Sequence, residues 1–329
     1  MSDLRLPADW EPHERCLMAW PGYGVRPQSL SGNARRDFAH VAQTIAEFEP
    51  VVMIADPGFG PEAESACGPG IEIVELVFDD VFIRDSGPLF AVRDGAELVA
   101  VDFRFNLWGS KRVRRERYAS TGRALAQWLG AARVEAPFVL EGGSVTTNGE
   151  GMLIAVATSV LNENRNPGSG REESEASFAE HLGIECTIWL EHGLVEDRTD
   201  GHADNVAVFV SPGRVLCQTV TAQDDANAPR LAANRATLEA AGLEVIELPV
   251  LPYASHERRI ALPYLNSFVG NNCVVVPLAG VAADEEGLAF LQEVWPNRDV
   301  VGVPGETLAR VGGGVHCITQ QVPLLAREE

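Results

Sequence analysis

Apolar positions along this chain recur at two periods, which predict alternating helices and strands. In residues 34–48 the apolar side chains are three or four positions apart, the spacing of one helix face. Residues 230–241 are rich in Ala, Leu and Glu, and Gly242 follows as a helix stop. Short β-branched runs at 51–54 and 273–277 predict strands. The predicted helices cover residues 34–48, 123–129, 230–241 and 286–294. The alternation predicts an α/β protein.

Five segments share a pattern in which an apolar or β-rich run leads into a polar element marked by glycine or asparagine. Asp85, Glu141, His202, Asn266 and Cys317 mark these segments, and the steps between them are 56, 61, 64 and 51 residues. Near-regular steps of this length predict a repeated supersecondary unit similar in size to a propeller blade. The chain has no linker and no low-complexity tract, so we expect one domain over residues 1–329.

The composition argues against several classes of protein. Apolar residues make up 46% of the 329 positions, but no run approaches the ~18 apolar residues of a membrane span. The N-terminal residues contain no signal-peptide core, so we expect a cytoplasmic protein with no membrane association. A net charge of −21 argues against a nucleic-acid partner and favours encounter with a small cation. The six cysteines form no CxxC pair, which predicts reduced thiols.

Cys317 stands at the end of a glycine-rich turn, Gly312-Gly313-Gly314-Val315-His316-Cys317. Consecutive glycines let the backbone approach a ligand closely, and residues 318–323 have the composition of a short strand ending at proline. A thiol there is a candidate nucleophile. The alternative is a small buried apolar residue, the usual role of a free cysteine.

His202 and Asp204 are two positions apart, after Gly201 and before the apolar run 206–210. If they lie in a strand, both side chains face one side of the sheet. The pair is then either part of a metal site or a general base beside a substrate-binding carboxylate. No further residues stand at metal-ligand spacing, so we predict no metal site.

Two more acids follow apolar runs. Glu141 ends a predicted strand and precedes two glycines, and Asp85 stands at the expected end of a strand before Ser86-Gly87-Pro88. Taken singly, each is more simply a carboxylate at a strand end or turn than a functional group.

Nine collinear motifs resemble those of the agmatine deiminase family, within the guanidine-modifying pentein superfamily that includes bacterial peptidylarginine deiminases. They extend over nearly the whole chain. The motifs are Pro7-Ala8-Asp9-Trp10-Glu11-Pro12-His13, Met18-Ala19-Trp20-Pro21, Phe82 to Pro88, Asp102 to Gly109, Glu141-Gly142-Gly143-Ser144, Leu161 to Pro167, Thr199 to Asn205, Tyr264-Leu265-Asn266 and Gly312 to Gln321.

The resemblance implies a five-bladed α/β-propeller (pentein fold) of pseudo-fivefold ββαβ repeats, and it implies roles for individual residues. Cys317 matches the nucleophile and His202 the general acid and base. Asp85 and Asp204 match the carboxylates that bind the guanidinium, and Glu141 matches the acid that orients the histidine and contacts substrate. The other implied substrate-binding residues are Phe82, Trp108, Asn266 and Gly314.

The implied reaction is cysteine-dependent hydrolytic deimination of a small cationic guanidino compound, most simply agmatine to N-carbamoylputrescine and ammonia. A guanidinium keeps its charge at neutral pH, having a pKa of about 12.5–13.8, and two carboxylates suit its planar donors. No cofactor is expected, and the resemblance leaves a homo-oligomer open. The alternatives are a guanidino substrate with an arginine-like or carboxylate-bearing tail, and a non-catalytic binding propeller.

The chain departs from the family pattern at three places. Phe82 replaces the usual tryptophan, and residues 22–27 lack the expected Asp-Asn-Trp-Arg run. The segment Lys111 to Arg117 carries five basic residues in seven. That basic run either balances the acidic surface or selects an anionic substrate tail or subunit contact. Trp108, standing in place of a carboxylate-binding arginine pair, favours an amine tail.

Overall fold

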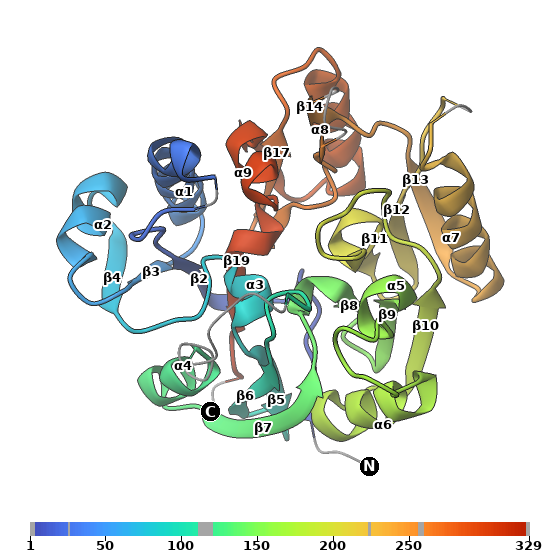
Figure 1. Cartoon of the computed structure of the whole chain (residues 1–329), viewed down its shortest axis with the longest axis horizontal. Helices are drawn as coiled ribbons and strands as arrows, with labels where there is room; N and C mark the ends of the chain where they lie inside the picture. Colours follow the sequence, from blue (N-terminus) through green and yellow to red (C-terminus); the bar gives the residue numbers. More distant parts are fainter. Residues whose placement is uncertain (1–3, 26, 111–120, 223–224, 256–259, 327–329) are drawn as a thin grey trace. The chain divides into compact units, whose positions relative to one another are not determined.

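The computed structural model describes residues 4–25, 27–110, 121–222, 225–255 and 260–326 and has an α/β architecture (Figure 1). The chain forms two compact units, each built from separate stretches of sequence. The first unit comprises Met1–Asp9, Asp85–Val250 and Leu325–Glu329, and the second comprises Trp10–Arg84 and Leu251–Leu324. The expectation of a single domain stays a prediction. In the described residues, no helix has both the length and the apolar character needed to cross a membrane.

The first unit contains three sheets with their helices. Its elements are β1 (Leu4–Arg5), β5 (Leu89–Arg93), β6 (Glu97–Arg104), α4 (Thr121–Leu129), β7 (Ala132–Val139), η3 (Gly142–Ser144), β8 (Val145–Thr147), β9 (Met152–Val156), α5 (Ala157–Val160), α6 (Arg171–Leu182), β10 (Cys186–Leu190), η4 (Ala203–Asn205), β11 (Ala207–Ser211), β12 (Arg214–Gln218), α7 (Ala228–Ala240) and β13 (Glu244–Leu248). The short helix α3 (Ile83–Ser86) begins in the second unit and ends in the first.

The second unit also contains three sheets, one of them a small two-stranded ribbon. Its elements are β2 (His13–Ala19), η1 (Gln28–Leu30), α1 (Ser31–Ala46), β3 (Val51–Ala55), α2 (Gly60–Cys67), β4 (Ile71–Glu75), β14 (Tyr253–Ser255), β15 (Ile260–Ala261), β16 (Phe268–Gly270), β17 (Cys273–Leu278), α8 (Ala283–Val294), β18 (Asp299–Pro304), α9 (Glu306–Val311), η5 (His316–Ile318) and β19 (Thr319–Pro323).

One pairing pattern recurs in five of the six sheets that the described residues form. An antiparallel pair of strands is followed by a helix, and the next strand then pairs in parallel with the second strand of the pair. The strand triplets are β5-β6-β7, β8-β9-β10, β11-β12-β13, β16-β17-β18 and β19-β2-β3. Because β19 pairs antiparallel with β2, the fifth triplet joins the two ends of the chain. The same ββαβ connectivity thus recurs within an α/β fold.

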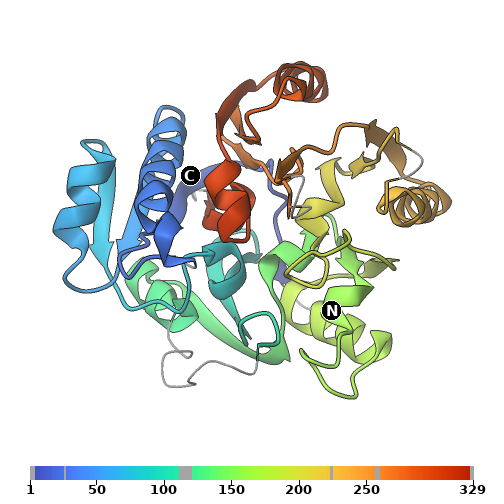
Figure 2. The same cartoon turned by 45° about the horizontal axis from the view of Figure 1, so that its top comes forward.

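Local sequence accounts for the elements around the β2–β3–β4 sheet. Every residue of β3 is buried, which fits the continuous apolar run of a parallel strand between two neighbours. In α1 the side chains of Phe38, Val41 and Ile45 are fully buried, and this helix contacts β3 and β4 (Figures 1 and 2). The helical spacing found in the sequence is therefore the buried face of α1.

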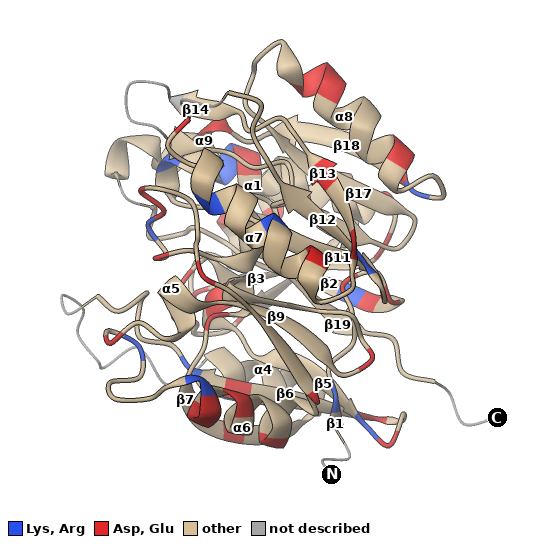
Figure 3. Ribbon diagram, turned by 90° about the vertical axis from the view of Figure 1, so that its right-hand side faces the viewer, with Lys and Arg blue, Asp and Glu red and all other residues tan. Residues whose placement is uncertain are grey.

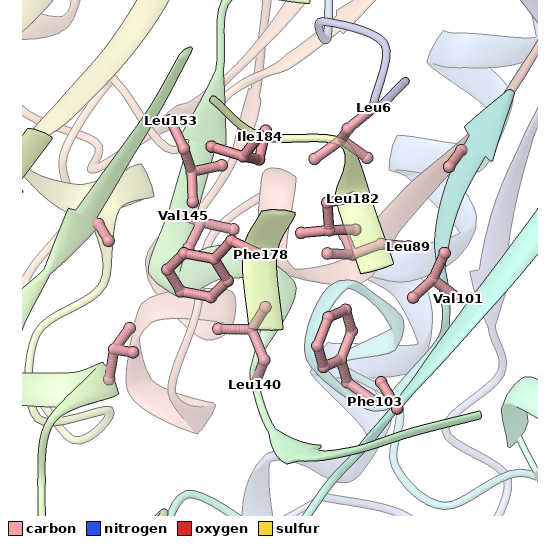
Figure 4. Packing of buried hydrophobic residues seen from close by; sticks show 14 of the residues in the cluster. Leu6, Leu89, Val101, Phe103, Leu140, Val145, Leu153, Phe178, Leu182 and Ile184 are labelled. Atoms are coloured by element: carbon pink, nitrogen blue, oxygen red, sulfur yellow. The ribbon is translucent and has the colours of Figure 1, made fainter. Parts of the chain in front are cut away.

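An apolar cluster of the first unit lies between the β5–β7 sheet, the β8–β9 pair and α6. Phe178 of α6 is fully buried at its centre, with Leu140 and Leu182 beside it (Figure 4). Burial of an aromatic or leucine side chain contributes roughly 1.5–3 kcal/mol. The cluster stabilises the strand ends from which the polar site residues of this unit extend.

The predicted helices and most predicted strands are confirmed within a few residues, but two strand predictions are wrong. Residues 76–82 form no strand, and Asp85 lies in the short helix α3. His202 and Asp204 do not lie in a strand either, because residues 203–205 form the 3₁₀ turn η4 and β11 begins at Ala207. Residues 162–170 form the loop before α6.

The surface helices carry much of the acidic excess (Figure 3). Helix α6 has four glutamates and one arginine, and α8 has four acids and no base. The basic run Lys111 to Arg117 lies outside the described residues.

Candidate active site

Four predicted polar residues of the first unit come together, although they are far apart in sequence. Asp85 lies in α3, Glu141 follows β7, and His202 and Asp204 flank the start of η4. Each is at most 3% exposed. Their proximity is most evident at Gly143, where an added Cβ would lie 2.6 Å from His202 Nδ1 and 2.9 Å from oxygens of both Asp85 and Asp204.

Local turns aim these side chains. In η4 the N–H of Asn205 donates to the His202 carbonyl, and the N–H of Val206 donates to the Ala203 carbonyl. This turn makes residues 202 and 204 converge, where the sequence suggested the alternation of a strand. The Gly143 N–H donates to Asp85 Oδ1 at 2.9 Å, so η3 fixes the carboxylate that α3 supplies.

Trp108 holds the other oxygen of Asp85. Its indole Nε1–H donates to Asp85 Oδ2 at 2.9 Å, and its ring meets Phe105 edge-on at a centroid distance of 5.0 Å. Leu107, Trp108 and Gly109 have φ values of 57°, 54° and 73°, and the left-handed region is costly for the first two. The strained turn places the indole N–H on the carboxylate.

His202 lies between two carboxylates at ion-pair distance. Its Nδ1 is 3.7 Å from Asp85 Oδ1 and its Nε2 is 3.5 Å from Glu141 Oε2. Burial alone would lower the imidazole pKa, but the charge of Asp85, the contact with Glu141 and the charge of Asp204 raise the pKa to about 10. The imidazole is therefore protonated at neutral pH before any ligand binds.

Asp85 experiences an excess of negative charge. Burial raises the pKa of its carboxyl group; the positive charge of His202 opposes that rise, and the charges of Asp204 and Glu141 reinforce it. A cation bound beside these acids would relieve this repulsion.

Arg165 is a residue that the sequence interpretation missed as part of the site. It lies in the loop between α5 and α6, and its Nε donates to Glu141 Oε1 at 2.8 Å. Burial tends to raise the pKa of Glu141, but the contact with His202 and the charge of Arg165 outweigh it and lower that pKa. The only signal in the sequence was an arginine inside the 161–167 motif.

The second unit supplies the other predicted residues. Cys317 lies in η5 and is 4% exposed; its backbone N–H donates to Asn266 Oδ1 at 3.3 Å, and its Sγ lies 3.3 Å from the same oxygen. The His316 N–H donates to the Asn266 carbonyl. The amide of Asn266 therefore fixes the turn that carries the thiol.

The glycines before Cys317 allow close packing, as the sequence suggested. A Cβ on Gly313 would lie 2.6 Å from the Phe82 ring and 3.1 Å from the Cys317 Sγ, and a Cβ on Gly314 would lie 2.4 Å from Asn266 Oδ1. Gly312 alone of the three has a positive φ, 124°. Phe82 and Cys317 therefore both lie against Gly313.

Comparison with known proteins gives the family. A family model described as Porphyromonas-type peptidyl-arginine deiminase matches residues 5–323. The chain belongs to this family. It is 38% identical to the agmatine deiminase of Stutzerimonas stutzeri, over 97% of this chain and 95% of that protein.

Solved structures of this family share the fold. The agmatine deiminase of Enterococcus faecalis, described as catalysing its reaction, superposes with a TM-score of 0.88 at 26% identity, covering 98% of this chain and 96% of that chain. A cysteine-to-serine variant of the C. jejuni agmatine deiminase with substrate bound gives a TM-score of 0.90 at 26% identity, covering 98% of this chain and 97% of that chain. The chain thus has the α/β pentein fold of these family members.

The structure places the predicted residues in two groups. Asp85, Glu141, His202, Asp204 and Trp108 form one, and the other consists of Phe82, Asn266, Gly314 and Cys317. Their individual catalytic roles stay predictions.

Proposed function

We propose that this protein hydrolyses the guanidinium group of agmatine to give N-carbamoylputrescine and ammonia. The names of the family's agmatine deiminases, one of them 38% identical over nearly the full length, support agmatine as substrate. The reaction places the protein among the hydrolases that act on guanidino C–N bonds, in polyamine metabolism. No cofactor is needed for the steps that follow.

One observation carries the proposal: three buried carboxylates surround a single histidine in the first unit. Asp85, Glu141 and Asp204 bring three acids, whereas His202 and Arg165 bring two cations. The three buried carboxylates repel one another, so this group favours one more cation. A guanidinium is planar and permanently charged, and its N–H groups pair with carboxylates in bidentate fashion.

The residues support a covalent mechanism in two stages. The Cys317 thiolate attacks the guanidinium carbon, the C–N bond to the terminal nitrogen breaks, and His202 protonates that nitrogen, which leaves as ammonia. A water deprotonated by His202 then adds to the amidino-thioether carbon. The C–S bond breaks, Cys317 is regenerated as thiolate, the remaining hydroxyl proton passes to ammonia or solvent as the ureido carbonyl forms, and the product is released.

Substrate binding also lowers the pKa of His202, the acid–base group. The pKa of His202 is about 10 because Asp85, Glu141 and Asp204 stabilise its positive charge. A guanidinium bound by Asp85 and Asp204 competes for the same carboxylates, so the pKa of His202 falls toward neutrality. The histidine then exchanges a proton in both stages, as acid first and as base second.

The buried Arg165 does not favour a substrate with a carboxylate-bearing tail. Arg165 donates to Glu141, Asn164, Asp200 and the Thr199 carbonyl, which occupies four of its five N–H donors. A guanidino compound with an anionic tail is the second candidate, favoured by the basic run Lys111 to Arg117 and by the family's description as peptidyl-arginine deiminases.

A substrate panel and one variant test the proposal. Agmatine, arginine, peptidyl-arginine and a methylated guanidine are compared by ammonia release and ureido product, and we expect the highest kcat/KM for agmatine. Cys317→Ala should remove ammonia release with unchanged circular dichroism, because no other group replaces the nucleophile. Turnover by that variant within about tenfold of wild type would eliminate the thiol mechanism.

We also infer that the five strand triplets form the five blades of a propeller. The same ββαβ connectivity occurs in each triplet, and every marker residue precedes the first strand of one triplet, which supports blades of one design. An experimental structure showing the five triplets about one axis would support this arrangement; a different order would contradict it.

A further inference from the structure

Arg165 makes an unusual set of contacts for an arginine in a loop. Its side chain is fully buried, and its donors reach the Glu141 carboxylate at 2.8 Å, the Asn164 side chain at 2.7 Å and the Thr199 carbonyl at 2.8 Å. The fourth partner is Asp200, whose backbone has a φ of 67°. Arginine is rarely fully buried unless its charge is paired.

The contacts with Thr199 and Asp200 alone would make Arg165 an anchor between two loops. The contact with Glu141 differs because that carboxylate has a second neighbour. Glu141 Oε1 accepts from Arg165, and Glu141 Oε2 lies 3.5 Å from His202 Nε2. One carboxylate therefore connects the buried guanidinium to the imidazole.

We propose that Arg165 is a positioning residue for deimination, holding Glu141 by one oxygen so that the other oxygen faces His202. The inference rests on the proposed function and names a group that acts on the histidine through the glutamate. Arg165 itself does not contact the substrate in this scheme.

The charged groups around Glu141 and His202 decide how the loss of Arg165 changes the protonation of these two side chains. Glu141 and His202 face Asp85 from α3, Asp204 from η4 and Arg165 from the α5–α6 loop, and Asp200 lies on the far side of Arg165. Without the guanidinium, the pKa of the Glu141 carboxyl rises, because burial is then opposed by His202 but no longer by the charge and hydrogen bond of Arg165. A protonated Glu141 no longer stabilises the imidazolium.

The test compares Arg165→Gln and Arg165→Lys with Arg171→Gln. Arg171 is six positions along the chain and pairs with Glu191 on the surface.

For Arg165→Gln we expect kcat to fall on the order of 10²-fold with KM changed less than about threefold. The acidic limb of the kcat/KM profile should move up by about one pH unit or more. Arg165→Lys should recover part of kcat, and Arg171→Gln should match wild type.

A double-mutant cycle separates positioning from loop anchoring. In a Glu141→Gln background, Arg165→Gln should lower kcat less than about threefold further, since the group that it positions is already neutral. This double variant also avoids leaving a buried carboxylate alone, which protects its folding. An equal loss of kcat in both backgrounds, or an unmoved acidic limb, would overturn the proposal.

Imidazole NMR of His202, assigned by comparison with His202→Gln, gives a readout that needs no turnover. Arg165→Gln should add an inflection as Glu141 takes up a proton, at a higher pH than the wild-type carboxyl does, and the double variant should lack it. Should wild type hydrolyse no guanidino compound, the proposed function fails, and this titration alone decides the link from Arg165 to His202. A missing inflection in folded Arg165→Gln contradicts that link.

Discussion

At the scale of single residues, His202 shows how neighbouring side chains determine the protonation state of a buried imidazole. Three acids on separate turns stabilise its protonated form more than burial destabilises it. Because its pKa is higher in the folded state than the reference of 6.5, folding favours the protonated form. The stabilising contribution is fully present below the unfolded pKa and is lost as the pH rises through the folded pKa.

The free energy of unfolding should therefore decrease between pH 6.5 and about 10, and His202 should cause much of the decrease. Urea titrations at several pH values should show a shallower decline for His202→Gln. His40→Gln, at an exposed position of α1, should keep the wild-type slope. The buried thiols Cys67 and Cys217, with pKa values raised to about 11 and about 12, lower stability only above about pH 8.5, where unfolded thiols ionise, and do so equally in all three proteins, so the slope below that pH reports His202.

An unchanged slope in His202→Gln would show that the imidazole is neutral in the folded protein. The assignment of His202 as the first-stage proton donor would then be wrong, because a bound cation lowers the pKa of the imidazole further.

At the scale of elements, the site depends on short turns before the first strand of each triplet. The turn η3 illustrates this, because Gly143 lies against three site side chains and donates its N–H to one of them. A methyl group at this position would push His202, Asp204 and Asp85 apart.

Gly143→Ala should lower kcat/KM by on the order of 100-fold or more, through displacement of the acid–base group. Gly32→Ala is a matched control, since Gly32 lies in α1 with nothing within 4 Å of an added Cβ. The control should keep its activity and gain up to about 0.5–1 kcal/mol of stability from the helical preference of alanine. Steady-state kinetics and thermal unfolding of both variants check this, and an active Gly143→Ala would mean that η3 is adaptable.

Periodicity identified the long elements of the fold but not these turns. Helix α1 and strand β3 were predictable because their apolar spacing is the spacing of a buried face. The turn η4 has hydrogen bonds three residues apart and no apolar period, so residues 202–204 were misread as strand. Arg165 was missed as a site residue because its partner Glu141 is 24 positions away and nothing in the loop sequence indicates that pairing.

At the scale of the whole molecule, the net charge of −21 bears on substrate encounter. The cationic substrate is attracted over distances comparable with the Debye length, about 10 Å at 0.1 M salt. The acids along α6 and α8 contribute to this field.

For agmatine, kcat/KM should fall several-fold between about 20 mM and about 300 mM NaCl, whereas kcat should stay nearly constant. Initial rates at low and at saturating substrate measure the two quantities. A salt-independent kcat/KM would show that encounter does not limit the reaction or that the local field is weak.

The pairing of β19 with β2 has a consequence for synthesis of the protein. Strand β2 has β3 on one side, and its other edge is covered only when β19, which is made much later than β2, pairs with it. Until then the nascent chain carries an open strand edge, the kind of surface that promotes aggregation. A chain cut short before Cys317 therefore lacks the thiol and leaves that edge uncovered, so truncated products are inactive and are substrates for quality control.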